Sequence, residues 1–98
     1  MKNEYLYGAK RFINKIIFYS QGRSFIELNN DQISFDAICY CLLMLESCFE
    51  KLDDANFINY QKNYLINKIK KTIKLGEYIN AESFDDLLAN IIPNIQLK

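Results

Sequence analysis

Residues 36–46 read Asp-Ala-Ile-Cys-Tyr-Cys-Leu-Leu-Met-Leu-Glu, and this stretch is the strongest indication of the fold. The nine apolar residues between the two carboxylates are about half of the ~20 that a membrane-spanning helix needs, so no membrane span is expected. Coiled as a helix, the stretch is apolar nearly all round, which is typical of a helix at the centre of a soluble domain. We predict this helix over residues 34–52, with Ser34 or Asp31 as its N-cap.

Two further helices are predicted on either side of the central one. The first covers residues 3–20 and ends at Gly22. Gly8 lies inside it and weakens its first turns. The other covers residues 55–75 and stops at Gly76, with lysines crowding its last turns. Their apolar stripes are Tyr5, Leu6, Ala9, Phe12, Ile13, Ile16 and Ile17 in the first, and Ile58, Leu65, Ile66, Ile69 and Ile73 in the other.

A fourth helix is predicted to start at Ser83, where Ser-Phe-Asp-Asp forms an acidic first turn, and to stop at Pro93. Its apolar positions follow the i, i+3, i+4, i+7 spacing of a buried helix face. They are Phe84, Leu87, Leu88 and Ile91. Residues 94–98 are expected to form a short tail.

Residues 22–32 allow two interpretations. Ser24 to Glu27 has the pattern of a capping box, which predicts a short helix. The alternative is a β-hairpin, in which residues 25–28 and 33–35 flank Asn29-Asn30-Asp31. The short helix or an irregular turn is favoured, because the chain has no Val and one Thr, and therefore few β-branched residues besides Ile.

Length and composition indicate one domain, residues 1–98, built as an all-α compact bundle of about four principal helices with one or two short extra helices. Charged residues early in the chain, Glu4, Lys10 and Arg11, argue against a signal peptide. The three cysteines Cys39, Cys41 and Cys48 fit no disulfide framework and are interpreted as reduced, small apolar residues. We therefore expect a cytoplasmic protein.

Composition also argues against catalysis. The chain has no His, no glycine-rich phosphate loop, no Gly-x-Ser-x-Gly and no Cys-x-x-Cys. The paired acids Asp53-Asp54 and Asp85-Asp86 are interpreted as helix-start residues, where capping explains them. We expect no enzyme activity, no cofactor and no metal site.

Although the net charge of the chain is zero, its charges are sorted along the sequence. Residues 1–27 carry +3, residues 28–60 carry −5, residues 61–76 carry +5 and residues 77–98 carry −3. One interpretation is that neighbouring helices of opposite sign pair within the protein. The other is that one surface faces a partner of opposite charge.

One side of the central helix resembles a binding surface. Carboxylates framing small apolar residues give an apolar centre with a polar rim, as in protein interfaces. At 100° per residue these side chains share an arc of about 100°. We call this set the acidic arc: Asp36, Cys39, Leu43, Glu46, Glu50 and Asp53.

Two other surfaces combine basic and aromatic residues. Such surfaces bind single-stranded nucleic acid, or pack on another element or a second subunit. The neutral net charge makes nucleic acid the less favoured partner. The basic/aromatic face of residues 55–75 is Tyr60, Tyr64, Lys68, Lys71 and Lys74, and a second line along residues 3–20 is Tyr7, Arg11, Asn14 and Phe18.

The chain has 14 Ile, 11 Asn, 10 Lys and 7 Tyr, a composition typical of an AT-rich gene. In this composition, its length and its helical pattern, it resembles the small helical immunity proteins of bacterial contact-dependent growth inhibition and bacteriocin systems. That resemblance implies a protein that binds one cognate toxin in the cytosol and blocks it, and a cationic nuclease would suit the acidic arc. The alternatives are a small helical nucleic-acid-binding or regulatory protein, and a homo-oligomeric accessory subunit.

Overall fold

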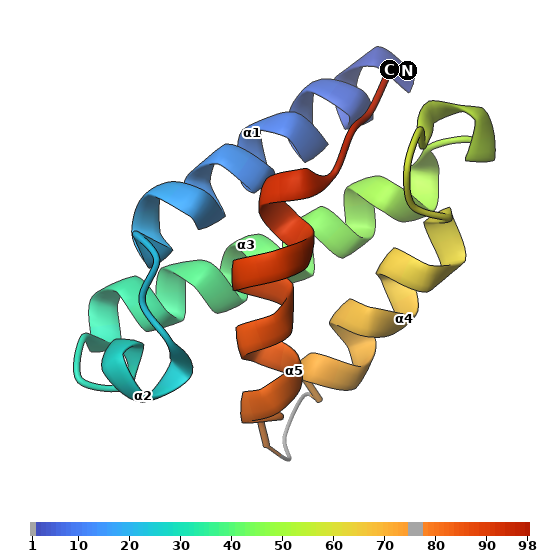
Figure 1. Ribbon diagram of the computed structural model, residues 1–98. Helices are drawn as coiled ribbons and strands as arrows, with labels where there is room; N and C mark the ends of the chain where they lie inside the picture. The colour runs from blue at the N-terminus through green and yellow to red at the C-terminus, as the bar shows by residue number, and fades with distance from the viewer. Residues whose placement is uncertain (1, 75–77) are drawn as a thin grey trace.

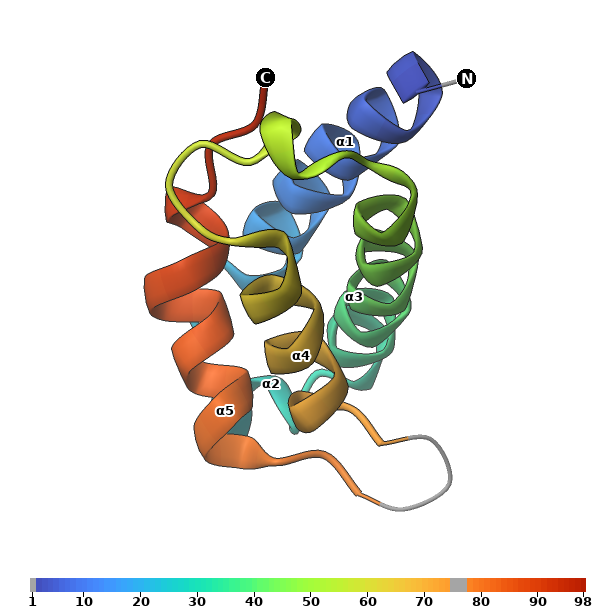
Figure 2. The ribbon, with the colours of Figure 1, turned by 90° about the vertical axis from the view of Figure 1, so that its right-hand side faces the viewer.

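Two long antiparallel helices, α1 and α3, lie side by side and form the base of the structure (Figure 1). The computed structural model describes residues 2–74 and 78–98. α4 packs on α3, and the helical run that begins with α5 crosses beside α4 and reaches α1 (Figure 2). The bounds are α1 Lys2–Ser20, α2 Phe25–Leu28, α3 Gln32–Lys51, η1 Asp54–Asn56, α4 Lys62–Thr72, α5 Ala81–Asp86, η2 Leu87–Ile91 and η3 Ile92–Asn94.

The prediction of an all-α bundle is confirmed. The described residues contain five α-helices and no extended strand, only two isolated β-bridges. The short connections bring the ends of the chain to the same end of the molecule (Figure 1). The radius of gyration of the Cα atoms is 12.7 Å, close to the ~13 Å expected of a 100-residue domain.

α3 supplies the centre of the core, as its all-round apolar stretch predicts. Its buried side contacts α1, α2 and α4, while its outer side leaves Tyr40 exposed. Asp31 is the N-cap, because its carboxylate accepts a hydrogen bond from the backbone N–H of Ser34 at 3.2 Å. The buried residues of α3 are Phe35, Ile38, Cys41, Leu42, Leu45, Cys48 and Phe49.

The connection from α1 to α3 contains the predicted short helix, and the hairpin alternative is wrong. Gln21 and Gly22 end α1 with φ angles of 46° and 74°, the left-handed conformation that glycine adopts most easily. Ser24 and Glu27 then form the predicted capping box around α2. The backbone N–H of Phe25 also donates to Asp85 at 2.6 Å, which ties α2 to α5.

The helix predicted over residues 55–75 is shorter in the structure, and its first part is wrong. Residues 57–61 are not helical, and α4 begins at Lys62. The amide of Asn59 bonds to the C-terminal segment instead, donating to the carbonyl of Asn94 and accepting from the N–H of Gln96. Ile58, predicted to be buried, is 55% exposed. Asparagine favours such bonds over an α-helix, because its short side chain competes for backbone groups.

The other end of this helix also differs. α4 ends at Thr72, and the predicted stop at Gly76 lies outside the described residues. Ile73 lies partly buried against the core. The tail predicted for residues 94–98 is held in place, since Leu97 forms an antiparallel bridge with Phe57.

The C-terminal helix begins before the predicted Ser83. Asn80 is its N-cap, accepting from the N–H of Ser83 at 2.9 Å. All four predicted apolar positions are buried: Phe84, Leu87, Leu88 and Ile91. The last turns are a π-helical segment and a 3₁₀ turn that contains Pro93, so the run ends at Asn94 rather than before the proline.

By length and composition alone, α3 could cross a membrane, with a mean hydropathy of 1.3 over its most apolar window. The central helix of a folded bundle has the same properties, and that is where α3 lies in this structure.

Candidate functional site

The acidic arc lies on the side of α3 that borders α4. Its centre is partly accessible, since Cys39 and Leu43 are half-buried. Asp36, Glu50 and Asp53 around it are exposed, while Glu46 is half-buried. Five of the six residues are held on one rigid helix, and Asp53 follows directly after the Leu52 C-cap.

Two cations from α4 reach this surface, Lys62 at its end and Lys70 beside Glu46 and Glu50. The Lys70 ammonium lies 3.9 Å from a carboxylate oxygen of Glu46 and 3.9 Å from one of Glu50. These distances are at the outer limit of an ion pair, and exposed pairs of this kind contribute about 0–1 kcal/mol. Internal pairing therefore explains part of the charge sorting, since Lys62 and Lys70 are two cations against the four carboxylates of the arc.

The surroundings of Glu46 disfavour the ionised form of its carboxyl. Burial raises the pKa of the Glu46 carboxyl, and a hydrogen bond that the protonated Glu46 carboxyl donates to Glu50, together with repulsion between the two carboxylates, raises it further, against the opposing effect of Lys70. A cation arriving from a partner would favour the ionised form of Glu46. This geometry is suited to recognising positive charge.

Two side chains order the ends of the arc. At the start of α3, the Gln32 amide donates to the Asp36 carboxylate at 2.8 Å. At its end, the Lys62 ammonium donates to the backbone carbonyls of Glu50 and Leu52, at 3.3 and 2.7 Å. Lys62 thus satisfies carbonyls that a helix end leaves unpaired.

The cysteines behave as apolar residues. Burial, and then the nearby Asp36 carboxylate, raise the pKa of the Cys39 thiol to about 11. Burial also raises the pKa of the Cys41 and Cys48 thiols. A thiol that stays protonated at neutral pH is a poor nucleophile, which agrees with the interpretation of Cys39 as a small apolar residue.

Most members of the predicted basic/aromatic face are engaged in contacts within the protein. Lys68 pairs with Asp86 of α5 at 2.8 Å. Tyr60, which lies outside the helix, stacks on Tyr64 with ring centres 5.9 Å apart. Lys74 lies 5.9 Å from the ring centre of Tyr78. Lys71 remains exposed at the rim of a polar hollow of about 620 Å³ between α4 and α5.

The second line, on α1, is strongly exposed. Tyr7 and Phe18 are 80% and 66% exposed, with Arg11 and Asn14 exposed between them. Sequence reasoning missed Lys10, Lys15 and Tyr19, which line the same shallow hollow of about 520 Å³. The helical wheel of α1 could have found them, because they flank the predicted line on both sides.

The acid pair Asp85-Asp86 does not lie at a helix start, which corrects the capping interpretation. Asp85 accepts from the N–H of Phe25, and Asp86 accepts from the Asn90 amide at 2.8 Å and pairs with Lys68. Hydrogen bonds from Asn90 and Lys68 lower the pKa of the Asp86 carboxyl. Both carboxylates therefore act in tertiary structure.

Across residues 2–74 and 78–98, no three Cys, Asp or Glu side chains converge in a way that would hold a metal ion. Comparison with protein-family models, with curated proteins and with solved structures finds no match to this chain.

Proposed function

We propose that this protein is a stoichiometric inhibitor of the immunity type, which binds a cognate bacterial toxin in the cytoplasm and blocks it. The observation that carries the proposal is the acidic arc on α3. Three carboxylates on the rigid helix, Asp36, Glu46 and Glu50, and Asp53 just after its end border a half-buried apolar centre. A cationic toxin surface, such as that of a nuclease, is the complementary partner.

The size of the arc suits a protein partner. Asp36 and Glu50 are 14 residues apart on α3, which is about 21 Å along the helix. A stable interface covers about 800 Å² on each partner, so a surface of this length supplies its central part. The half-buried Leu43 and Cys39 would form the dry centre and the carboxylates the rim.

Lys70 would be displaced rather than buried when the partner binds. Its side chain is 58% exposed, and both of its contacts in the arc are 3.9 Å long. An arginine of the partner could bind the same carboxylates in two-pronged geometry, which is stronger. Electrostatic attraction would also speed association and make it sensitive to salt.

The test uses the genes that adjoin the gene for this protein. Each neighbouring product is expressed in a bacterial host and scored for growth arrest, with and without co-expression of this protein. We expect one neighbour to arrest growth, and this protein to relieve the arrest and to form a 1:1 complex with it. Absence of any neighbour that this protein neutralises or binds contradicts the proposal.

A charge reversal then tests the surface. Glu50→Lys changes an exposed residue of the arc, and we expect it to weaken the complex about tenfold or more. Glu82→Lys is the matched control, because Glu82 is exposed on α5 and its substitution makes the same change in net charge. Equal loss of binding in both variants would show that the acidic arc is not the interface.

The alternative of a nucleic-acid-binding or regulatory protein is less well supported by the geometry. Of the lysines on the basic/aromatic face, Lys68 is paired with Asp86 and Lys74 lies over Tyr78. Nucleic-acid binding would weaken steeply with salt, in proportion to the phosphates contacted. The homo-oligomer alternative is tested by sedimentation at micromolar concentration, where a monomer contradicts it.

A further inference from the structure

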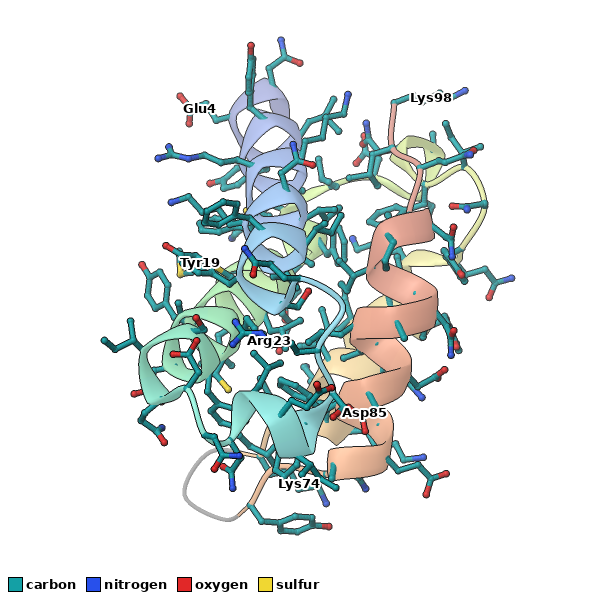
Figure 3. The ribbon with its side chains drawn as sticks, turned by 60° about the vertical axis from the view of Figure 1, so that its left-hand side comes forward. Glu4, Tyr19, Arg23, Lys74, Asp85 and Lys98 are labelled. Carbon is teal, nitrogen blue, oxygen red and sulfur yellow. The ribbon has the colours of Figure 1, made fainter. Side chains whose placement is uncertain are left out.

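The outer side of α1 presents aromatic side chains to solvent. Tyr7 and Phe18 stand at the ends of a straight row whose inner members are Arg11 and Asn14. The spacing of i, i+4, i+7 and i+11 makes one ridge about 16 Å long. Tyr19 meets Phe18 edge to face, with ring centres 5.5 Å apart. Figure 3 shows the side chains standing out along α1, with Tyr19 on the side that borders α3.

The outer side of α3 extends this surface. The helices are antiparallel and close: a Cβ on Gly8 would lie 3.1 Å from the Cys48 sulfur, and the Lys15 charge acts on the Cys41 thiol. In this register Gly8 lies opposite Cys48 and Lys15 lies near Cys41, so Tyr40 is level with the part of α1 around Lys15. The position of Tyr40 on the α3 helical wheel turns its side chain to the same outer side. Tyr40 is 60% exposed, and Ile33, two turns earlier on α3, is 84% exposed.

The hollow along α1 is cationic, while exposed carboxylates border the wider surface at Glu4, one turn before Tyr7, and at Asp36, one turn before Tyr40. Three cations, Lys10, Arg11 and Lys15, line the hollow along α1, and no carboxylate lines it. Tyrosine and arginine are among the residues enriched where partners bind tightly, because they combine apolar area with hydrogen-bonding groups. A complementary partner must therefore present apolar groups bordered by carboxylates.

We propose that this outer α1 surface, which includes Tyr7, Arg11, Lys15, Phe18 and Tyr40, binds an acidic amphipathic helix of another protein. A helix laid along the ridge would place its apolar stripe on Tyr7 and Phe18 and its carboxylates near the three cations. The surface shares no residue with the acidic arc, although Tyr40 lies one turn from Asp36, and the inference does not depend on the proposed function.

A protein helix fits better than a nucleic acid. Phe18 and Tyr19 meet at 74°, so they do not form a pair of parallel platforms for successive bases. Three cations would release only about two counterions from a single strand, which gives weak binding at physiological salt. The 16 Å ridge matches about three turns of a partner helix.

The first experiment measures fluorescence anisotropy with three labelled helical peptides of about five turns each. They share one leucine stripe and carry glutamate, glutamine or lysine at the remaining positions. We expect the glutamate peptide to bind about tenfold or more tightly than the other two, and to weaken as salt is added. Equal binding of the three, or no binding of the glutamate peptide, overturns the proposal.

A short single-stranded oligonucleotide and vesicles containing anionic lipid are measured in the same way. Tighter binding of either probe than of the glutamate peptide overturns the proposal in favour of that other class of partner.

Variants of the full chain locate the site. Tyr7→Ala, Phe18→Ala and Arg11→Glu change exposed side chains, so the fold should persist, and circular dichroism checks it. Each substitution is expected to weaken binding of the glutamate peptide about tenfold. Tyr78→Ala and Lys71→Glu are matched controls on exposed residues elsewhere. Loss of binding in the controls equal to that in the α1 variants would contradict the assignment.

Discussion

Thr72 and Ser83 are two hydroxyl residues buried where α4 meets α5. They are 0% and 4% exposed, and their oxygens lie 2.6 Å apart. The hydroxyl group of Thr72 has a single hydrogen, which it donates to the backbone carbonyl of Lys68 at 2.7 Å. Ser83 must therefore be the donor to Thr72. The sequence shows that Thr72 is the one threonine, but no local pattern places it opposite a serine 11 residues later.

This pair predicts strong non-additivity. Thr72→Val leaves the Ser83 hydroxyl without its acceptor, so we expect it to lower the free energy of unfolding by about 1–3 kcal/mol. In Thr72→Val with Ser83→Ala, neither polar group remains, and the loss should be smaller than the sum of the two single losses. Urea denaturation of the four proteins measures this. Additive losses would contradict the hydrogen bond.

Among the elements, the contact between α1 and α3 depends on Gly8. In the sequence this glycine reads as a weakness in the first turns of α1. In the structure it allows close packing, because a Cβ there would lie 3.1 Å from the Cys48 sulfur. The space for a side chain at Gly8 is thus set by the neighbouring helix α3, not by the sequence around Gly8.

The close contact predicts coupling between Gly8 and Cys48. Gly8→Ala gains about 1 kcal/mol of helix propensity but must push the sulfur aside. In a Cys48→Ala background the sulfur is gone, so the same substitution should be more stabilising there, by about 1 kcal/mol. Thermal and urea unfolding of the double-mutant cycle test this. An equal effect of Gly8→Ala in both backgrounds would show that the contact is not tight.

The helices also show where local patterns suffice. The ends of α1, α2 and α3 are predicted to within about two residues, because caps and apolar periodicity depend on residues that are near neighbours in the sequence. Residues 57–61 are mispredicted, because their hydrogen bonds go to the C-terminal segment, as in the bond between Asn59 and Gln96. The gain from such non-local bonds is invisible to a window of neighbouring residues.

For the molecule as a whole, pH acts through carboxylates alone below neutrality, since the chain has no His. A hydrogen bond from Arg23 lowers the pKa of the Asp31 carboxyl below its usual 3.8, and hydrogen bonds from Asn90 and Lys68 lower the pKa of Asp86. These groups stabilise the fold above their unfolded pKa, and that stability is lost as pH falls through their folded pKa. Glu46 acts oppositely, because its folded pKa lies above 4.5.

The free energy of unfolding should therefore be flat between about pH 6 and 8 and fall in acid. Asp86→Asn should reduce the loss of unfolding free energy below pH 3.8, because the variant lacks the carboxyl whose pKa is lowered in the folded protein. Glu46→Gln should remove the small gain that protonating Glu46 gives as pH falls toward 4.5. Urea denaturation across pH measures both. A steep dependence between pH 6 and 8 would contradict this assignment.

As with the fold, some features of the candidate sites follow from the sequence of a single helix and others depend on how the helices pack. Residues on one side of one helix, as in the acidic arc on α3 and the Tyr7 to Phe18 row on α1, follow from the 3.6-residue period, which local backbone hydrogen bonds impose. The pairing of Lys68 with Asp86, the approach of Lys70 to Glu46, and the joining of Tyr40 to the α1 surface depend on how separate helices pack. Packing brings together side chains that no short stretch of chain relates, so the composition of each surface was settled by the tertiary fold.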